Sequence, residues 1–245
     1  MNKSLYTIAE NTLIAVKTFK LVLVGDGVVE GEFVHIGIPG YYLRRPLSIC
    51  DNENGRLTVV YKVVGEGTKV LSEMGVGAVL EVLTGLGRGF DPDACEASAL
   101  LVGGGLGVPP LYLLAKELKA RGKRVTAVLG FNKADEMILA DEFKAVCDKV
   151  VISTADGSVG VRGFVTDALR EMAGHDGRHD YFYTCGPTVM MKAVCAALEG
   201  PGEASLEERM GCGAGFCYGC SIQTENGPRR VCKDGPVFKK EELLW

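Results

Sequence analysis

Four cysteines near the C-terminus constrain this chain more than any other feature. Cys212, Cys217 and Cys220 have the spacing C-x4-C-x2-C, and Cys232 follows after eleven further residues. This is the plant-type ligand spacing of a [2Fe–2S] cluster, in which each iron takes two thiolates. The same segment contains glycines that let backbone N–H groups approach the sulfur atoms, namely Gly211, Gly213, Gly215 and Gly219. The spacing therefore predicts a [2Fe–2S] cluster held by the four cysteines.

A structural zinc and a disulfide knot are the alternatives for the same cysteines. Structural zinc sites usually contain two CxxC or CxxH pairs, whereas only Cys217 and Cys220 form such a pair here. The chain has nine cysteines, an odd number, and no recognisable leader. We therefore expect a reducing, cytoplasmic environment, which disfavours disulfides. The isolated cysteines are interpreted as small buried hydrophobic residues: Cys50, Cys95, Cys147 and Cys195.

Composition narrows the class of protein further. The chain has 245 residues, 47% of them hydrophobic, which is enough to bury a large core. No segment approaches the ~20 uninterrupted apolar residues that a membrane-spanning helix needs. Lys and Arg are spread along the chain and the net charge is −4. We expect a protein that binds neither a membrane nor nucleic acid.

The hydrophobic pattern changes twice along the chain, which predicts an α+β protein of several domains. Residues 1–95 contain short β-branched runs separated by Gly, Pro and Asn, and this pattern is typical of an antiparallel β-barrel. The predicted strands are Phe19–Val24, Glu32–Ile38, Leu47–Cys50, Leu57–Val64 and Val79–Leu83, with one helix at Thr68–Met74. Residues 201–245 hold the four cysteines and too little apolar material to fold alone, so we expect metal ligation to stabilise this small C-terminal domain.

Residues 96–200 alternate between strand and helix, which predicts an α/β nucleotide-binding domain with a parallel sheet. The predicted strands are Ala99–Val102, Val125–Phe131, Lys149–Ser153 and Asp180–Thr184. The predicted helices are Pro110–Arg121, Asp135–Cys147, Phe164–Met172 and Thr188–Leu198. A ligand is expected at the carboxyl ends of these strands.

A glycine loop follows the first of these strands. Gly105 and Gly107 lie in the run Gly103–Pro110, directly before a helix whose free N–H groups suit a pyrophosphate. Pro110 stands where the usual dinucleotide fingerprint has its third Gly or Ala. A second element, Cys185-Gly186-Pro187, ends a later strand at the same edge, where Cys185 would face a nicotinamide ring. Together they predict NAD as co-substrate, and only Lys133 is near enough to favour NADP.

A flavin is needed to connect these two sites. A nicotinamide exchanges two electrons at once and a [2Fe–2S] cluster accepts one, and a flavin can do both. The chain has no second glycine fingerprint, so the barrel must bind the flavin. The candidate residues are Arg45, Pro46, Leu47 and Ser48, then Val60, Tyr61 and Lys62, then Gly67 and Thr68 at a helix start.

Arg45-Pro46-Leu47-Ser48 resembles the R-x-[YF]-[ST] flavin motif of the ferredoxin reductase superfamily, with Leu47 in place of the aromatic residue. In that superfamily the Arg meets the flavin phosphates and the hydroxyl meets the isoalloxazine. Gly67-Thr68 resembles its helix-start phosphate site. The order of barrel, nucleotide domain and four-cysteine loop is similar over almost the whole chain to the electron-transfer subunits of B-type dihydroorotate dehydrogenases.

That resemblance implies FAD, a [2Fe–2S] cluster and a partner. In that family the subunit docks on an FMN-containing catalytic subunit that oxidises dihydroorotate in pyrimidine biosynthesis, and we expect a heterotetramer with two copies of each. Electrons would pass from FMN to the cluster, to FAD and to NAD+. No catalytic acid or base is expected on this chain, and His35, His175 and His179 are interpreted as core or surface residues.

Two other functions remain open from the sequence. A related flavin and [2Fe–2S] reductase subunit, of the ferredoxin:NADP reductase or sulfide dehydrogenase type, would keep the cofactors and change the partner. In that branch a carboxylate replaces one cluster cysteine, whereas all four cysteines are present here. A zinc-stapled nucleotide-sensing module would leave the Arg45 and Thr68 motifs unexplained and would be colourless.

Overall fold

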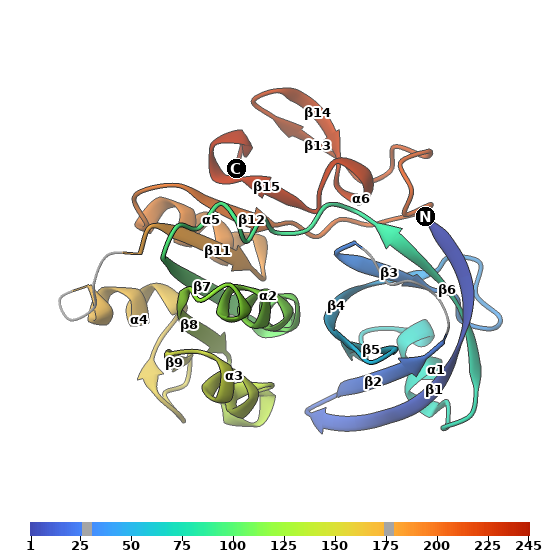
Figure 1. Cartoon of the computed structure of the whole chain (residues 1–245). Helices are drawn as coiled ribbons and strands as arrows, with labels where there is room; N and C mark the ends of the chain where they lie inside the picture. Colours follow the sequence, from blue (N-terminus) through green and yellow to red (C-terminus); the bar gives the residue numbers. More distant parts are fainter. Residues whose placement is uncertain (26–30, 174–178) are drawn as a thin grey trace. The chain divides into compact units, whose positions relative to one another are not determined.

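The computed structural model describes residues 1–25, 31–173 and 179–245, so His175 lies outside the described residues (Figure 1). The chain folds as two compact units. The first unit comprises Met1–Gly89 and Glu207–Val237, and the second comprises Phe90–Leu206 and Phe238–Trp245. The four-cysteine segment therefore shares a unit with the N-terminal strands. No helix in the described ranges is both long and apolar enough to cross a membrane.

The N-terminal part of the first unit is a closed barrel, which confirms the predicted antiparallel architecture. Its strands run in the order β1-β2-β5-β4-β3-β6, and neighbouring strands are antiparallel. Their bounds are β1 (Asn2–Ala15), β2 (Thr18–Val24), β3 (Phe33–Ile36), β4 (Arg45–Glu53), β5 (Arg56–Lys62) and β6 (Val79–Leu86). The sequence did not indicate β1, because only Tyr6 and Ile8 of its side chains are buried and the apolar alternation is correspondingly short.

One helix, α1 (Glu66–Glu73), interrupts the barrel strands close to the predicted position. Its start is fixed by Thr68, whose hydroxyl accepts the Gly65 N–H at 3.2 Å and the Val64 N–H at 3.0 Å and donates to the Gly65 carbonyl at 2.9 Å. A hydroxyl three residues into a helix satisfies donors that have no intrahelical partner. These three bonds connect the loop before α1 to the first turn of the helix.

The second unit is built on a seven-stranded sheet in the order β10-β9-β8-β7-β11-β12-β15. The strands are β7 (Ser98–Gly104), β8 (Arg124–Phe131), β9 (Lys149–Thr154), β10 (Val161–Arg162), β11 (Tyr181–Cys185), β12 (Gly202–Ser205) and β15 (Val237–Lys239). The pairs from β10 to β12 are parallel, which confirms the predicted parallel sheet. The short strands β10 and β12 were not predicted, since each has few residues and no distinct apolar pattern.

Helices cover both faces of this sheet. α2 (Val108–Ala120) and α3 (Ala140–Val146) pack together, and α4 (Val165–Met172) packs against α5 (Thr188–Ala197). Leu100 and Val102 of β7 point into the core beneath α4 and α5, together with Met191 and Val194. α3 is shorter than predicted, because a 3-10 turn at Ala134–Glu136 precedes it and Leu139 has a φ of 57°. A left-handed residue cannot continue a right-handed helix.

The cysteine segment contains little regular structure. After the loop that carries three of the cysteines, β13 (Ser221–Thr224) and β14 (Gly227–Arg230) form a hairpin, and the single-turn helix α6 (Val231–Asp234) carries Cys232. The hairpin returns the chain to the loop, because the Val231 N–H donates to the Cys220 carbonyl at 3.1 Å. The hairpin is thus what brings the fourth cysteine to the other three.

Candidate functional site

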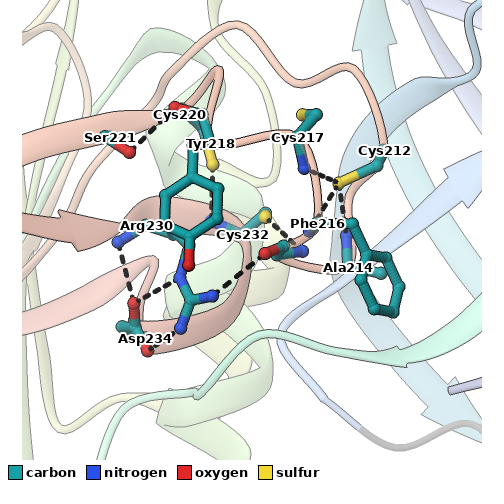
Figure 2. A network of polar contacts seen from close by, with 11 residues as sticks. Cys212, Ala214, Phe216, Cys217, Tyr218, Cys220, Ser221, Arg230, Cys232 and Asp234 are labelled. Atoms are coloured by element: carbon teal, nitrogen blue, oxygen red, sulfur yellow. Dashed lines mark hydrogen bonds and ion pairs between the residues drawn. The ribbon is translucent and has the colours of Figure 1, made fainter.

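The four predicted cluster cysteines lie together in one loop and the helix that faces it (Figure 2). Gly213 and Gly215 have φ angles of +67° and +83°, a conformation that L-residues rarely adopt. These glycines turn successive N–H groups towards the sulfur atoms. The sulfur of Cys212 accepts N–H bonds from Ala214 at 3.4 Å, Phe216 at 3.2 Å and Cys217 at 3.4 Å.

The sulfur atoms interact in two pairs. Cys217 contacts Cys212, and Cys220 contacts Cys232, whose own N–H donates to the Cys220 sulfur at 3.4 Å. Throughout residues 1–25, 31–173 and 179–245, no three His, Cys, Asp or Glu side chains form a group that could hold a metal ion. Two thiolates for each of two irons is the arrangement that a [2Fe–2S] cluster requires. The four thiols and their pairing fit a [2Fe–2S] cluster.

The hydrogen bonds of the loop favour an anionic sulfur at Cys212, whereas burial raises the pKa of Cys232 to about 12. Burial acts to raise the pKa of Cys212, but the three N–H donors and the Cys217 thiol outweigh it and lower that pKa to about 6. Hydrogen bonds to the charged form stabilise a thiolate, and the thiolate is the form that ligates a metal. All nine cysteines of the chain are free.

Arg230 ties the loop to the helix that carries Cys232. Its Nε donates to Asp234 at 3.0 Å, a second guanidinium nitrogen donates to the same carboxylate at 3.2 Å, and a third donates to the Gly215 carbonyl at 3.0 Å. The guanidinium also lies 5.1 Å from the centroid of the Tyr218 ring. Sequence reasoning missed this clamp. The two charges four residues apart in Arg230-Val231-Cys232-Lys233-Asp234 are the only signal that could have indicated it.

A cavity of about 870 Å³ lies in the first unit beside the predicted flavin motif. Its lining comprises Tyr41, Tyr42, Leu43, Arg44, Arg45, Pro46, Val64, Glu207, Glu208, Arg209 and Met210. The Arg45 guanidinium packs directly on Gly67 in the first turn of α1, where any Cβ would overlap it, and its centre lies 5.1 Å from the Tyr41 ring. A cation placed beside free helix N–H groups suits a phosphate. These residues fit the diphosphate of a flavin nucleotide.

The other predicted flavin residues lie on β4, on β5 and at the start of α1. Leu47 and Ser48 are half-buried on β4, and Lys62 is half-buried at the end of β5. Val60 is buried, and so is Tyr61, whose hydroxyl donates to Asn11 at 2.9 Å and whose ring stacks on Phe19. The Thr68 hydroxyl makes hydrogen bonds with Val64 and Gly65 at the start of α1. The side chains of Tyr61 and Thr68 therefore stabilise the barrel and the helix start.

The second unit contains a cavity of about 350 Å³ at the carboxyl ends of its strands. Gly104, Gly105 and Pro187 line it, together with Gly130, Phe131, Asn132, Glu136, Ser153, Gly163, Phe164, Val165, Thr166, Val189, Met190 and Ala193. Gly107 packs on the backbone of Cys185 and Gly186 with no room for a Cβ, so the structure brings the two predicted nucleotide motifs together. Cys185 is buried, with 3% of its surface exposed.

Sequence reasoning missed four polar residues of this cavity, namely Asn132, Glu136, Ser153 and Thr166. Asn132 follows β8, its amide donates to Glu136 at 3.1 Å, and Ser153 lies near the end of β9 with its hydroxyl buried. The positions of Asn132 and Ser153 at the ends of parallel strands were the available signal. The helix α2 begins at Val108, two residues before the predicted start, with Pro109 and Pro110 in its first turn, where missing N–H groups cost nothing. The cavity lies at the sheet edge where a nucleotide is expected, next to the glycine loop.

Comparisons with known proteins match the regions that contain the four cysteines and the glycine loop. Residues 207–244 match the iron-sulfur cluster binding domain of dihydroorotate dehydrogenase B, and residues 101–196 match the oxidoreductase NAD-binding domain. The chain is 43% identical to the dihydroorotate dehydrogenase B (NAD(+)) electron transfer subunit of Fusobacterium nucleatum, covering 97% of this chain and 96% of the relative. The corresponding subunit of Bacillus pumilus is 41% identical over 99% of this chain and 98% of the relative.

Solved structures show the same fold. An NADH-dependent reduced ferredoxin-NADP oxidoreductase, studied for flavin-based electron bifurcation, superposes with a TM-score of 0.88 at 33% identity, covering 98% of this chain and 90% of that one. Phthalate dioxygenase reductase superposes with a TM-score of 0.65 at 21% identity, over 79% of this chain and 63% of that one, and shares the fold alone.

Proposed function

This chain belongs to the family of electron transfer subunits of dihydroorotate dehydrogenase B (NAD(+)), and from this premise we propose that it serves an FMN-containing catalytic subunit that oxidises dihydroorotate in pyrimidine biosynthesis. When bound, the [2Fe–2S] cluster and FAD supply a relay between one-electron and two-electron carriers, with NAD+ as the final acceptor. The observation that carries the proposal is the pairing of Cys212 with Cys217 and of Cys220 with Cys232.

The residues of this chain bind and orient, and none of them is proposed as an acid or base. Cys212, Cys217, Cys220 and Cys232 hold the cluster. Arg45 and the N-terminus of α1 hold the flavin diphosphate, supported by the strand residues Pro46, Leu47, Ser48, Val60, Tyr61 and Lys62 and by Gly67 and Thr68. Gly105, Gly107 and the segment Cys185-Gly186-Pro187 hold NAD(H).

The surface next to the cluster loop suits a protein partner. Cys217 is exposed, and the flanking Phe216 and Tyr218 leave 76% and 65% of their surfaces exposed. Exposed aromatic residues beside a redox centre are disfavoured in water and favoured at interfaces. We propose that the catalytic subunit covers them, in a heterotetramer of two copies of each chain located in the cytoplasm.

The test is to prepare the protein anaerobically with its tagged candidate catalytic subunit. We expect flavin and iron–sulfur absorption, equal amounts of iron and acid-labile sulfide, co-purification of the two chains and NAD+ reduction by dihydroorotate. Cys220→Ser should abolish the cluster absorption, while Cys147→Ser, in the second unit, should leave it unchanged. A preparation without iron, sulfide or flavin would overturn the proposal.

A second candidate is a reductase subunit like the NADH-dependent ferredoxin-NADP oxidoreductase, because that structure matches 98% of this chain. The Glu136 carboxylate in the nucleotide cavity disfavours this candidate where NADP is the nucleotide, since it would repel a 2′-phosphate. Steady-state assays with NADH and NADPH distinguish the two. A preference for NADPH, or activity with reduced ferredoxin and none with dihydroorotate, would favour the second candidate.

A further inference from the structure

Within the part of the chain that the structure describes, the ring of one buried barrel histidine has no hydrogen-bond partner. His35 on β3 is 1% exposed, and neither of its ring nitrogens has a hydrogen-bond partner among the described residues. A buried polar atom left without a partner costs about 1–3 kcal/mol. Native proteins rarely keep such atoms, and each one calls for an explanation such as strain, a redox role, a water or a bound group.

The ring lies against the cluster loop. A Cβ placed on Gly213, the residue after the ligand Cys212, would be 2.5 Å from the Nδ1 of His35 and 2.8 Å from its Cε1. Gly213 is buried and its φ is +67°, so two separate constraints require glycine there. Because both residues belong to the first unit, the contact is internal to one compact body.

The same histidine is also adjacent to the flavin motif. In the pairing of β3 with β4, His35 lies opposite Pro46 and Ile36 lies opposite Arg45. Phe33 packs its ring edge-on to the imidazole, with the centroids 6.3 Å apart. The ring is thus fixed between the strand that carries Arg45 and the loop that carries three cluster ligands.

The protein groups around this imidazole favour its neutral form. Burial first, and then the positive charges of Arg44 and Arg45, lower the pKa of His35 to about 4. A neutral imidazole carries one N–H donor and one acceptor nitrogen. Sulfur atoms of iron–sulfur clusters accept such N–H bonds, and these bonds help to set the reduction potential.

We propose that His35 donates a ring N–H hydrogen bond to a sulfur atom of the bound [2Fe–2S] cluster and thereby raises its reduction potential. A donor near the cluster stabilises the additional negative charge of the reduced form. This inference rests on the proposed function, because it requires the cluster to be bound by the four cysteines. It assigns a role to a residue that sequence analysis placed among core or surface histidines.

The first test uses the intact protein with ¹⁵N-labelled histidine. Pulsed electron paramagnetic resonance of the reduced cluster should reveal a weak ¹⁵N hyperfine coupling from one histidine. The coupling should disappear in His35→Leu and persist in His179→Gln, because the ring of His179 lies in the second unit, 3.2 Å from the Ser98 hydroxyl. A cluster signal without any histidine coupling in the unmodified chain would overturn the inference, however the variants behave.

The second test measures the midpoint potential of the cluster in anaerobic titrations. His35→Leu removes the donor at similar volume and should shift the potential to a more negative value. His35→Asn, whose amide nitrogen reaches nearly the position of Nδ1, should restore part of that shift. An unchanged potential in His35→Leu at full iron content would also overturn the inference, whereas absence of iron and sulfide from the unmodified protein would instead remove the proposed function.

Discussion

In the second unit, the Asp180 carboxylate accepts three hydrogen bonds from the residues just before and at the start of β7. It accepts the N–H groups of Ala97 at 2.7 Å and Ser98 at 2.9 Å, and the Cys95 thiol donates to it at 3.2 Å. Burial acts to raise its pKa, but these bonds outweigh burial and hold the pKa below its usual range. One side chain before β11 therefore fixes the residues that open β7, the strand leading to the glycine loop.

The pH dependence of stability follows from that shift. A carboxylate whose pKa is lower in the folded state contributes stability above its unfolded pKa of about 3.9, and this contribution is lost as pH falls through the folded value. We expect Asp180→Asn to lower the free energy of unfolding by about 1.5–3 kcal/mol at neutral pH, because charge-assisted bonds are lost. Urea unfolding should show this difference shrinking below about pH 4.

The matched control for Asp180 is Asp141→Asn. The Asp141 side chain is 91% exposed and forms an ion pair with Lys144 on the same helix. Exposed pairs of this kind contribute about 0.3–0.5 kcal/mol. Equal effects of the two substitutions, or an Asp180 effect that persists unchanged in acid, would contradict the assignment.

Among the elements, α6 is too short to hold Cys232 by itself and depends on the Arg230 clamp. A single helical turn has no intrahelical stability of its own in water. The bidentate contact to Asp234 and the bond to the Gly215 carbonyl therefore fix the distance between Cys232 and the loop. Lysine cannot make these contacts together, because it offers one point charge in place of a planar fork.

We expect Arg230→Lys to release the cluster about tenfold faster to an iron chelator, since each lost charged bond contributes about 1.5–3 kcal/mol. The measurement is the decay of cluster absorption under anaerobic conditions. Arg229→Lys is the control, because Arg229 is the neighbouring exposed residue on β14. Indistinguishable decay rates for the two variants would show that the clamp does not hold the cluster.

Elements with a strong local pattern could be predicted from the sequence, and those defined by distant contacts could not. The barrel strands β2 to β6 and the strands and helices around the glycine loop follow from apolar periodicity, whereas β1, β10 and β12 have no distinct apolar pattern and were not predicted. The break before α3 depends on the left-handed Leu139, which no pattern indicates. The cluster ligands are given by spacing, but the role of Gly213 depends on the His35 ring, which comes from the far end of the sequence.

At the level of the whole molecule, the chain leaves the first unit at Gly89 and returns to it at Glu207. The returning segment is bound to the barrel by the Arg88 N–H, which donates to the Gly235 carbonyl at 2.6 Å, and by the contact of Gly213 with His35. A bound cluster would therefore stabilise the first unit by closing a segment that has little apolar core of its own. The second unit has a separate core.

Removal of the cluster should consequently loosen one unit and leave the other intact. After chelation, we expect faster amide hydrogen exchange throughout residues 207–237 and in β3, because ligation no longer offsets the entropy of ordering the loop. Exchange in β7 and β8, which lie in the middle of the parallel sheet, should not change. Mass spectrometry of peptides from the two units measures this directly. A uniform acceleration across both units would contradict the division, and an unchanged pattern in residues 207–237 would mean that the segment folds without metal.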